Sequence, residues 1–247
     1  MFKKFLIISL GLATLLSAYF LTANWFFYHQ ISIAKLTVSD IKHKYIFNEA
    51  ATSSPGLIYV ALGDSLTAGV GTIDYQDSYP YLVAQKLAAT ELKVTHLNYS
   101  YPGAKTADII YNLLDEVVLS QPDVVTLLIG VNDAYDRVDS QKFRLNYESI
   151  LKRLTSETSA RVNVISIPLI GSKYSLWPGY RDYYHVKSIA LNNIIKELAD
   201  QYQVNYIDLT DSTKEYSLTP DYYAADGFHP AGLGYQYWAE IIYEHLN

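Results

Sequence analysis

The sequence predicts a three-layer α/β/α domain built on a parallel sheet, preceded by one transmembrane helix. Short apolar runs of strand length alternate with segments that have helical spacing. Strands buried on both faces form continuous apolar runs, and helices between them imply parallel pairing with right-handed crossovers. A third observation, a long uncharged run near the N-terminus, predicts the membrane helix.

The N-terminal run begins after Lys3 and Lys4 and extends from Phe5 to Phe27, and no charged residue follows before Lys35. At about 1.5 Å per residue, a run of this length spans a hydrocarbon core of roughly 30 Å. The two lysines favour a cytoplasmic N-terminus, which places the rest of the chain outside the cytoplasm at the cell membrane. A cleaved signal peptide, and hence a secreted protein, is the alternative.

Three regions follow from this pattern. Residues 1–28 are the transmembrane anchor or signal segment, and residues 29–55 have the mixed composition of a stalk or linker. Residues 56–247 form the globular domain. The run Ala-Thr-Ser-Ser-Pro-Gly at residues 51–56 is a loop signal just before the first strong strand.

The elements of the domain follow one another in strict alternation. We expect strands at 57–62, 94–99, 124–129, 162–167 and 204–209. Apolar residues at helical spacing predict helices at 78–90, 106–119, 140–155, 183–202 and 233–246. The segment 168–182 has no clear period, and its aromatic residues form either a wall for an acyl group or sugar, or a structural surface loop.

Composition excludes several classes of function. Half of the 247 residues are apolar, which excludes a wholly disordered chain. Lysine and arginine number 19 against 25 acidic residues, for a net charge of −6, and no basic block occurs, so we expect no nucleic-acid partner. The chain has no cysteine, which excludes disulfide scaffolds, cysteine-ligated metals and thiol catalysis.

Four short segments stand where strands end or just before the last helix. Gly63-Asp64-Ser65-Leu66 follows the first strand, the segment from Asn98 to Gly103 follows the second, and Gly130-Val131-Asn132-Asp133 follows the third. Asp226-Gly227-Phe228-His229 precedes the last helix. Ligand sites of open parallel sheets lie outside the carboxyl ends of the strands, so we expect these four segments to meet there.

Together these residues suit acyl transfer through a serine ester. Ser65 is the candidate nucleophile, His229 its general base, and Asp226 the group that orients the imidazole. The backbone N–H groups of Ser65 and Gly103 and the side-chain amide of Asn132 are candidate donors of an oxyanion hole. The other histidines do not cluster at ligand spacing, and no phosphate-loop motif occurs, so we expect neither metal nor cofactor.

Each residue also has a simpler structural interpretation. Ser65 could cap a helix, Asp226 could belong to an ordinary Asp-Gly turn, and Gly103 could serve a Pro-Gly turn. We interpret Asp64 as a structural residue that holds the nucleophile turn, and Asp133 as a cap for the segment after it. The combination of all four segments in order favours the catalytic interpretation.

The four segments resemble those of the SGNH (GDSL) hydrolases, a family named for the serine, glycine, asparagine and histidine of four sequence blocks. The resemblance covers about residues 56–247, and none of the blocks departs from the family pattern. It implies a flavodoxin-like sheet and ester hydrolysis without a metal. Members include esterases, lipases, thioesterases, lysophospholipases and carbohydrate O-acetylesterases.

The sequence therefore predicts a membrane-anchored serine esterase with its catalytic domain outside the cytoplasm, acting on lipid-like esters such as lysophospholipids. An O-acetylesterase of polysaccharide or peptidoglycan is the first alternative. An acyltransferase and an inactive surface-binding module are two further alternatives. The expected partners are an ester substrate, which could be an acetylated glycan, and the membrane, through the N-terminal helix.

Overall fold

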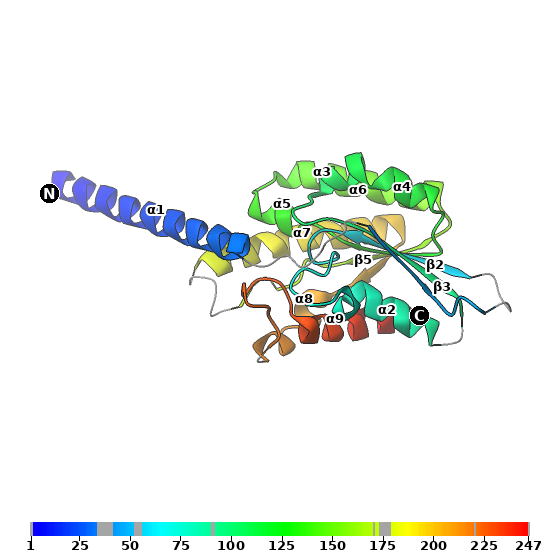
Figure 1. Cartoon of the computed structure of the whole chain (residues 1–247). Coiled ribbons are helices and arrows are strands. Elements are labelled where there is room, and N and C mark those ends of the chain that lie inside the picture. Colours follow the sequence, from blue (N-terminus) through cyan, green and yellow to red (C-terminus); the bar gives the residue numbers. More distant parts are fainter. Residues whose placement is uncertain are drawn as a thin grey trace.

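Six strands form one sheet in the order β1-β3-β2-β4-β5-β6 in a computed structural model (Figure 1). The structure describes residues 2–33, 42–51, 56–89, 92–169, 171–172, 179–219 and 221–246. The strands are β1 (Lys42–Phe47), β2 (Leu57–Gly63), β3 (Val94–Ser100), β4 (Val124–Leu128), β5 (Arg161–Ile165) and β6 (Asn205–Ile207). The predicted strands 57–62 to 204–209 are therefore confirmed within a few residues.

The sheet is mixed, so the prediction of a wholly parallel sheet was wrong. Strands β2 to β6 pair in parallel, but β1 pairs antiparallel with β3, with Lys42 opposite Tyr99 and Phe47 opposite Val94. Strand β1 falls within the segment 29–55 that we predicted as a linker. Its sequence, Lys-His-Lys-Tyr-Ile-Phe, is half charged or polar, as suits an edge strand exposed to water, and lacks the apolar run that marks a central strand.

Helices cover both faces of the sheet. Helices α2 (Tyr79–Ala88) and α9 (Gly232–His245) pack together on one face. The other face carries α3 (Thr106–Asn112), α4 (Leu114–Leu119), α6 (Ser140–Glu157) and α7 (Tyr180–Tyr202). The short helices α5 (Val131–Tyr135) and α8 (Leu209–Ser212) follow the ends of strands. Two 3₁₀ turns, Tyr75–Asp77 and Tyr216–Leu218, lie in the loops. Three layers result, as predicted.

The core lies between these layers and surrounds the central strands. Strand β4 is buried along its whole length, and β2 is buried from Tyr59 to Gly63, which explains why both are unbroken apolar runs. Strand β2 has β3 on one side and β4 on the other, so the chain order reverses at this strand. Such a reversal opens a crevice at the carboxyl ends of the central strands.

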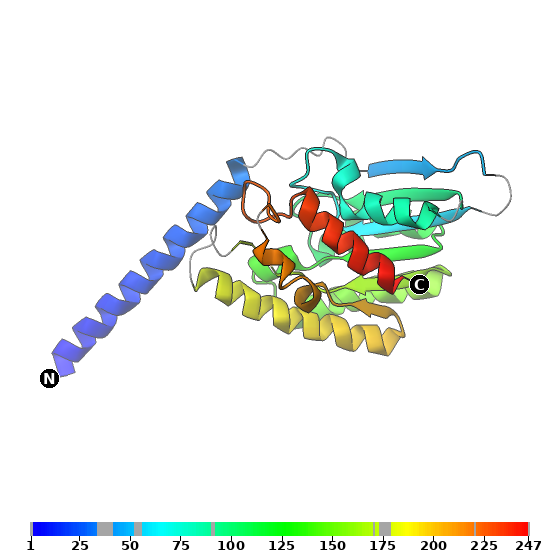
Figure 2. The ribbon, with the colours of Figure 1, turned by 90° about the horizontal axis from the view of Figure 1, so that it is seen from below.

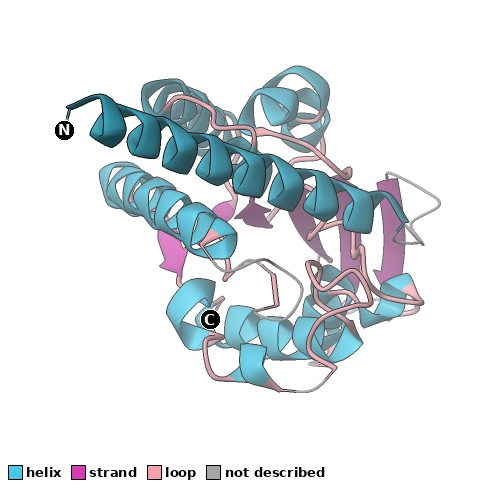
Figure 3. Ribbon diagram, turned by 90° about the vertical axis from the view of Figure 1, so that its left-hand side faces the viewer, coloured by secondary structure: helices cyan, strands magenta, loops and turns pink. Residues whose placement is uncertain are grey.

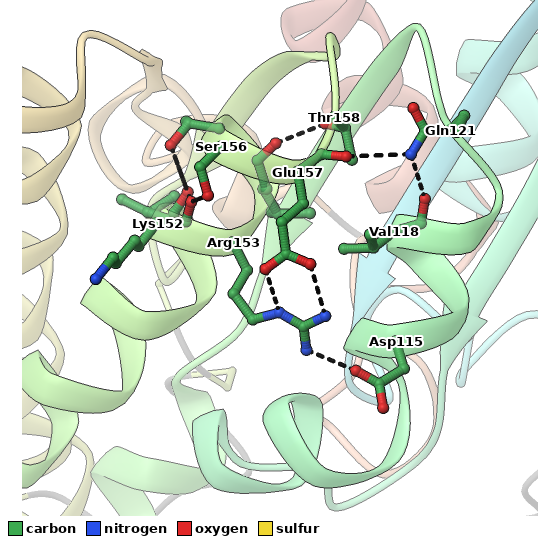
Figure 4. Close-up of polar contacts among 11 residues, drawn as sticks. Asp115, Val118, Gln121, Lys152, Arg153, Ser156, Glu157 and Thr158 are labelled. Carbon is green, nitrogen blue, oxygen red and sulfur yellow. Dashed lines mark hydrogen bonds and ion pairs between the residues drawn. The ribbon is translucent and has the colours of Figure 1, made fainter.

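A polar cluster joins α4 to α6 near the opposite, amino-terminal edge of the sheet (Figure 4). The Arg153 guanidinium donates to both carboxylate oxygens of Glu157 at 2.8 and 3.0 Å and to Asp115 at 2.6 Å. Gln121 adds a hydrogen bond to the carbonyl of Glu157 at 3.1 Å. Exposed ion pairs of this kind contribute about 0–1 kcal/mol each, so this cluster aligns the helices more than it stabilises them.

Helix α1 (Phe2–Ile33) leaves the domain on the side of the carboxyl ends of the strands, opposite the C-terminus (Figures 1 and 2). Within the described residues it is the one helix long and apolar enough to cross a membrane, from Lys3 to Phe26, with a mean hydropathy of 2.0. A signal sequence shares these properties. The helix is longer than the predicted segment 1–28, and its C-terminal half contacts α7.

Candidate active site

The Gly-Asp-Ser turn follows β2 directly and is held by its own backbone. The Leu66 N–H donates to Asp64 Oδ1 at 2.9 Å, and the Ala68 N–H donates to the Asp64 carbonyl at 2.8 Å. Gly63 packs so tightly that a Cβ there would lie 2.3 Å from the carbonyl oxygen of Leu128 in β4. The turn is therefore fixed against the central strands, and Asp64 has the structural role that we predicted for it.

The side chains of Ser65, His229 and Asp226 form a hydrogen-bonded series. Ser65 Oγ lies 3.0 Å from His229 Nε2, and His229 Nδ1 lies 2.6 Å from Asp226 Oδ2. All three residues are buried, with exposed fractions of 5%, 3% and 7%. The structure thus brings together three residues separated by up to 164 positions in the chain.

The Asp226–His229 segment is a tight turn in which one carboxylate holds both backbone and side chain. Asp226 Oδ1 accepts from the N–H groups of Phe228 at 2.8 Å and His229 at 3.0 Å, while Oδ2 faces the imidazole. Gly227 adopts a φ of +63°, in the left-handed region that favours glycine. Asp226 therefore is a turn residue and the partner of His229 at the same time.

Asn132 lies between the Ser65 turn and the Gly103 loop. Its Nδ2 donates to the carbonyl of Ala104 at 2.9 Å and lies 3.5 Å from Asp64 Oδ2. Ala104 follows Gly103, which has a φ of +83° and an exposed backbone. The three predicted oxyanion donors thus lie on segments that meet at one side chain.

Asp133 has a different role from the one we predicted. It lies within α5 and does not cap the segment after it. Its Oδ2 accepts from the Thr106 N–H at 3.0 Å, and its Oδ1 accepts from Thr106 Oγ1 at 2.6 Å, which ties the start of α3 to the Asn132 segment. The sequence does not indicate this pairing, because Asp133 and Thr106 are 27 residues apart.

Burial and hydrogen bonding set the charges of the carboxyl groups here. Complete burial raises the pKa of Asp64 to about 7 against the effect of the Leu66 N–H, and burial also raises the pKa of Asp133. For Asp226 burial acts in the same direction, but the hydrogen bond and charge of His229, with two backbone N–H groups, outweigh it and lower the pKa. Asp226 is therefore the carboxylate that stays ionised beside the imidazole.

A second polar network lies under the Gly-Asp-Ser turn, and little in the sequence predicts it. Asn98 of β3 donates to the Thr67 carbonyl at 2.7 Å and to Tyr75 Oη at 2.6 Å. Tyr75 Oη in turn lies 2.8 Å from His96 Nε2. The Tyr75 hydroxyl therefore joins the Asn98 amide to the His96 ring. The only available signal was the polar alternation of β3, in which His96, Asn98 and Ser100 are buried on one face.

A small apolar pocket adjoins the serine. Its walls are Leu66, Val131, Pro168, Leu169, Tyr223, Phe228, Pro230 and Trp238. Leu66 follows Ser65 and Phe228 precedes His229 in the chain, so the pocket lies beside these two residues. We expected the aromatic residues of segment 168–182 to form either a wall for the substrate or a structural surface loop, and two of them, Tyr174 and Trp177, lie outside the described residues. Tyr180 is the first residue of α7 and donates to Asn24 of α1.

Comparisons with known proteins agree with this fold. The chain is similar to an arylesterase of Vibrio mimicus, with 26% identity over 201 residues, covering 80% of this chain and 92% of that protein. It is also similar to the crystal structure of a lipase/acylhydrolase from Enterococcus faecalis, with a TM-score of 0.64, 28% identity, and coverage of 77% and 95%. An acetyl xylan esterase, AlAXEase, has the same fold, with a TM-score of 0.62, 23% identity and coverage of 77% and 100%.

The profile of one protein family matches most of the domain. The match extends over residues 61–237 and includes the segments of Ser65, Gly103, Asn132 and His229. The chain belongs to the GDSL-like Lipase/Acylhydrolase family.

Proposed function

We propose that the protein is a serine esterase that hydrolyses carboxylic esters through Ser65, His229 and Asp226. The observation that carries the proposal is the hydrogen-bonded series from Ser65 Oγ to His229 at 3.0 Å and on to Asp226 at 2.6 Å. An imidazole in this position can accept the hydroxyl proton, and a carboxylate behind it holds the correct tautomer and stabilises the imidazolium.

The reaction has two halves. In the first, Ser65 Oγ attacks the ester carbonyl carbon while its proton passes to His229 Nε2, and the collapse of the tetrahedral intermediate expels the alcohol, which takes that proton. An acyl-serine remains. In the second, water attacks the acyl-serine, gives its proton to the same nitrogen, and the carboxylic acid leaves as Ser65 recovers its proton.

The negative oxygen of each intermediate needs donors. We assign them to the N–H groups of Ser65 and Gly103 and to Asn132 Nδ2. One Nδ2 hydrogen bonds to the Ala104 carbonyl, and the 3.5 Å contact of Nδ2 with Asp64 leaves the second hydrogen weakly engaged. That hydrogen is the one we assign to the oxyanion, and such a donor contributes about 3–4 kcal/mol to transition-state stabilisation.

We propose that the substrate is a lipid-like ester and that α1 anchors the enzyme in the cell membrane, with the domain outside the cytoplasm. Lys3 and Lys4 before the apolar run support this orientation. The apolar pocket beside Ser65 is too small for a long acyl chain, which favours a second candidate, an O-acetylesterase of an envelope glycan.

The first test is Ser65-dependent turnover. We would assay the full chain on p-nitrophenyl esters from acetyl to palmitoyl and on acetylated glycans, with Ser65→Ala as the blank and a fluorophosphonate probe as a label for Ser65. Turnover that rises with acyl length supports the lipid-like substrate, and turnover confined to acetyl esters supports the glycan. If the fluorophosphonate probe does not label Ser65 and neither the p-nitrophenyl esters nor the glycans are hydrolysed, the esterase proposal is rejected.

A further inference from the structure

The C-terminal half of α1 packs on the catalytic domain. Asn24 Oδ1 accepts from Tyr180 Oη at 3.0 Å, and the ring of Phe20 meets that of Tyr183 edge to face at 6.4 Å between centroids. Ala23 is 2% exposed and belongs to the hydrophobic core. The domain therefore contacts the apolar helix directly, by residues that lie far from it in sequence.

The position of this contact along α1 corresponds to the surface of a bilayer. Counted from Lys4, about 20 residues at about 1.5 Å each cross the roughly 30 Å hydrocarbon core and reach Asn24. Upstream of Asn24 the helix exposes apolar side chains, for example Phe5 at 73% and Ile7 at 71%. Trp25 and Tyr28, at 64% and 47% exposure, follow at the depth that these residue types favour.

The adjoining surface of the domain has the composition of a membrane interface. Tyr183 and Val186 of α7 are 37% and 66% exposed and lie on the same face of the helix as Lys187. The Arg137 guanidinium and the Lys187 ammonium lie 5.8 and 5.9 Å from the centre of the Tyr183 ring. Aromatic and aliphatic side chains beside two cations suit the boundary between acyl chains and lipid phosphates.

This surface is close to the active site. Helix α1 crosses in front of the carboxyl-terminal side of the sheet when the molecule is viewed from that side (Figure 3). The groove between α1 and the domain is lined in part by Leu21, Tyr135 and Arg137. Tyr135 meets Phe228 edge to face at 5.5 Å, and Phe228 meets the His229 ring at 4.8 Å. Two aromatic rings therefore separate the groove from the catalytic imidazole.

We infer that the patch formed by Arg137, Tyr183, Val186 and Lys187 lies on the surface of the bilayer that α1 crosses. The docked helix then holds the active-site face against the membrane, and the enzyme takes esters carried by membrane amphiphiles. The location of the patch is independent of the chemistry, whereas the choice of substrate rests on the proposed ester hydrolysis.

A fluorescent label tests the location of the patch, and the absence of cysteine makes single labels unambiguous. Val186→Cys and, as a control, Leu119→Cys place one thiol each on an exposed apolar position, 66% and 80% exposed. Leu119 ends α4, which lies on the same face of the sheet as α7 but at the end away from α1 (Figure 1). Each full-length variant is labelled with a nitrobenzoxadiazole dye and reconstituted in phosphatidylcholine–phosphatidylglycerol vesicles.

The dye at position 186 is expected to emit at shorter wavelength and to be quenched by nitroxide lipids, while the dye at position 119 behaves as in water. Equal, water-like behaviour at both positions would overturn the inference whatever the catalytic activity is.

A second pair of variants tests the consequence for the substrate. Asn24→Leu and Tyr180→Phe remove the hydrogen bond between α1 and α7. We expect an unchanged rate on p-nitrophenyl acetate in solution and a loss of about fivefold on a long-chain ester embedded in vesicles, as for one hydrogen bond removed. An unchanged vesicle rate would reject the role of docking. Absence of Ser65-dependent turnover on both substrates would reject the proposed function and leave the dye result intact.

Discussion

Asp133 holds Thr106 with both carboxylate oxygens, at 3.0 Å to its N–H and 2.6 Å to its hydroxyl. This pair joins α5, which carries Asn132, to the start of α3, which follows the Gly103 loop. The two proposed oxyanion donors of these segments are therefore kept at a constant separation by residues that themselves do not reach the substrate. We interpret Asp133 and Thr106 as positioning residues.

Thr106→Val tests this interpretation, because valine keeps the shape of the side chain and removes its hydroxyl. Asp133 then loses a buried hydrogen bond, which we expect to destabilise the fold by about 1–3 kcal/mol and to lower kcat with little change in KM. Thr155→Val is the control, because the Thr155 hydroxyl donates to Leu151 of its own helix at 2.9 Å. Equal effects of the two variants on kcat would contradict a positioning role.

Asp226→Asn is expected to lower kcat by about 10³–10⁴, since an amide can present its N–H to the imidazole and favour the wrong tautomer. Because its pKa is lowered, Asp226 is ionised in the folded enzyme at any pH above the ordinary pKa range of aspartate. Stability from this group is present above that range and is lost as the pH falls through the lowered pKa.

Urea unfolding at pH 2 to 5 should show this loss of stability. Asp221→Asn in the same loop is the matched control, because Asp221 is exposed and its φ of +65° also suits asparagine. A control as inactive as Asp226→Asn would mean that the loop, and not the carboxylate, is what matters.

Asn132→Ala is expected to lower kcat by about 10²–10³ and to leave KM nearly unchanged, because the oxyanion forms only in the transition state. Steady-state kinetics on a short p-nitrophenyl ester measure this directly. Asn112→Ala, which removes an exposed amide that donates to Tyr101 at 3.0 Å, should leave both constants unchanged. A rise in KM alone would show that Asn132 binds the ground state and is not an oxyanion donor.

Alanine substitutions at Gly71 and Gly103 distinguish the effect of steric packing from the effect of backbone strain. Both have positive φ, +100° and +83°, so alanine strains either backbone by about 1–2 kcal/mol. At Gly71 the new Cβ would also lie 2.3 Å from the Pro230 carbonyl and 3.0 Å from His229 Cβ, whereas at Gly103 it meets no atom within 4 Å.

We therefore expect Gly71→Ala to displace the His229 loop, with a larger loss of both stability and activity than Gly103→Ala. Urea denaturation and esterase assays of the two purified variants measure this difference. Similar losses in both would show that the His229 loop moves freely to accommodate the methyl group.

Asp64 makes the stability of the fold depend on pH in the opposite sense to Asp226. Its pKa of about 7 in the folded state means that the folded chain keeps a proton that the unfolded chain releases near the ordinary value of 3.8. The free energy of unfolding should therefore fall as the pH rises between these two values, by at most about 1.4 kcal/mol per pH unit, and level off above them.

Asp64→Asn should flatten this dependence. The comparison requires urea titrations of the wild type and the variant from pH 4 to 8. If both chains show the same slope, the proton at Asp64 does not cause it.

Much of the fold was predictable because it depends on local patterns. The apolar runs at 57–62 and 124–129 predicted central strands, and helical spacing predicted the helices between them. The exception is a break at Leu113, which separates α3 from α4. The predicted catalytic residues come from motifs just after these strands or before α9. Strand β1 escaped prediction because an edge strand contacts the sheet on one side only and needs no apolar run.

The sequence by itself determined the alternation of strands and helices, the apolar N-terminal helix and the four family segments, because each depends on residues adjacent in the chain. Only the tertiary structure decided that β1 runs antiparallel, that Asp133 binds Thr106, that Asn98 supports the serine turn and that α1 docks through Asn24 on Tyr180. These contacts join residues between 27 and 156 positions apart. A hydrogen bond across such a separation depends on the packing of the whole domain, and no local pattern of residue types encodes it.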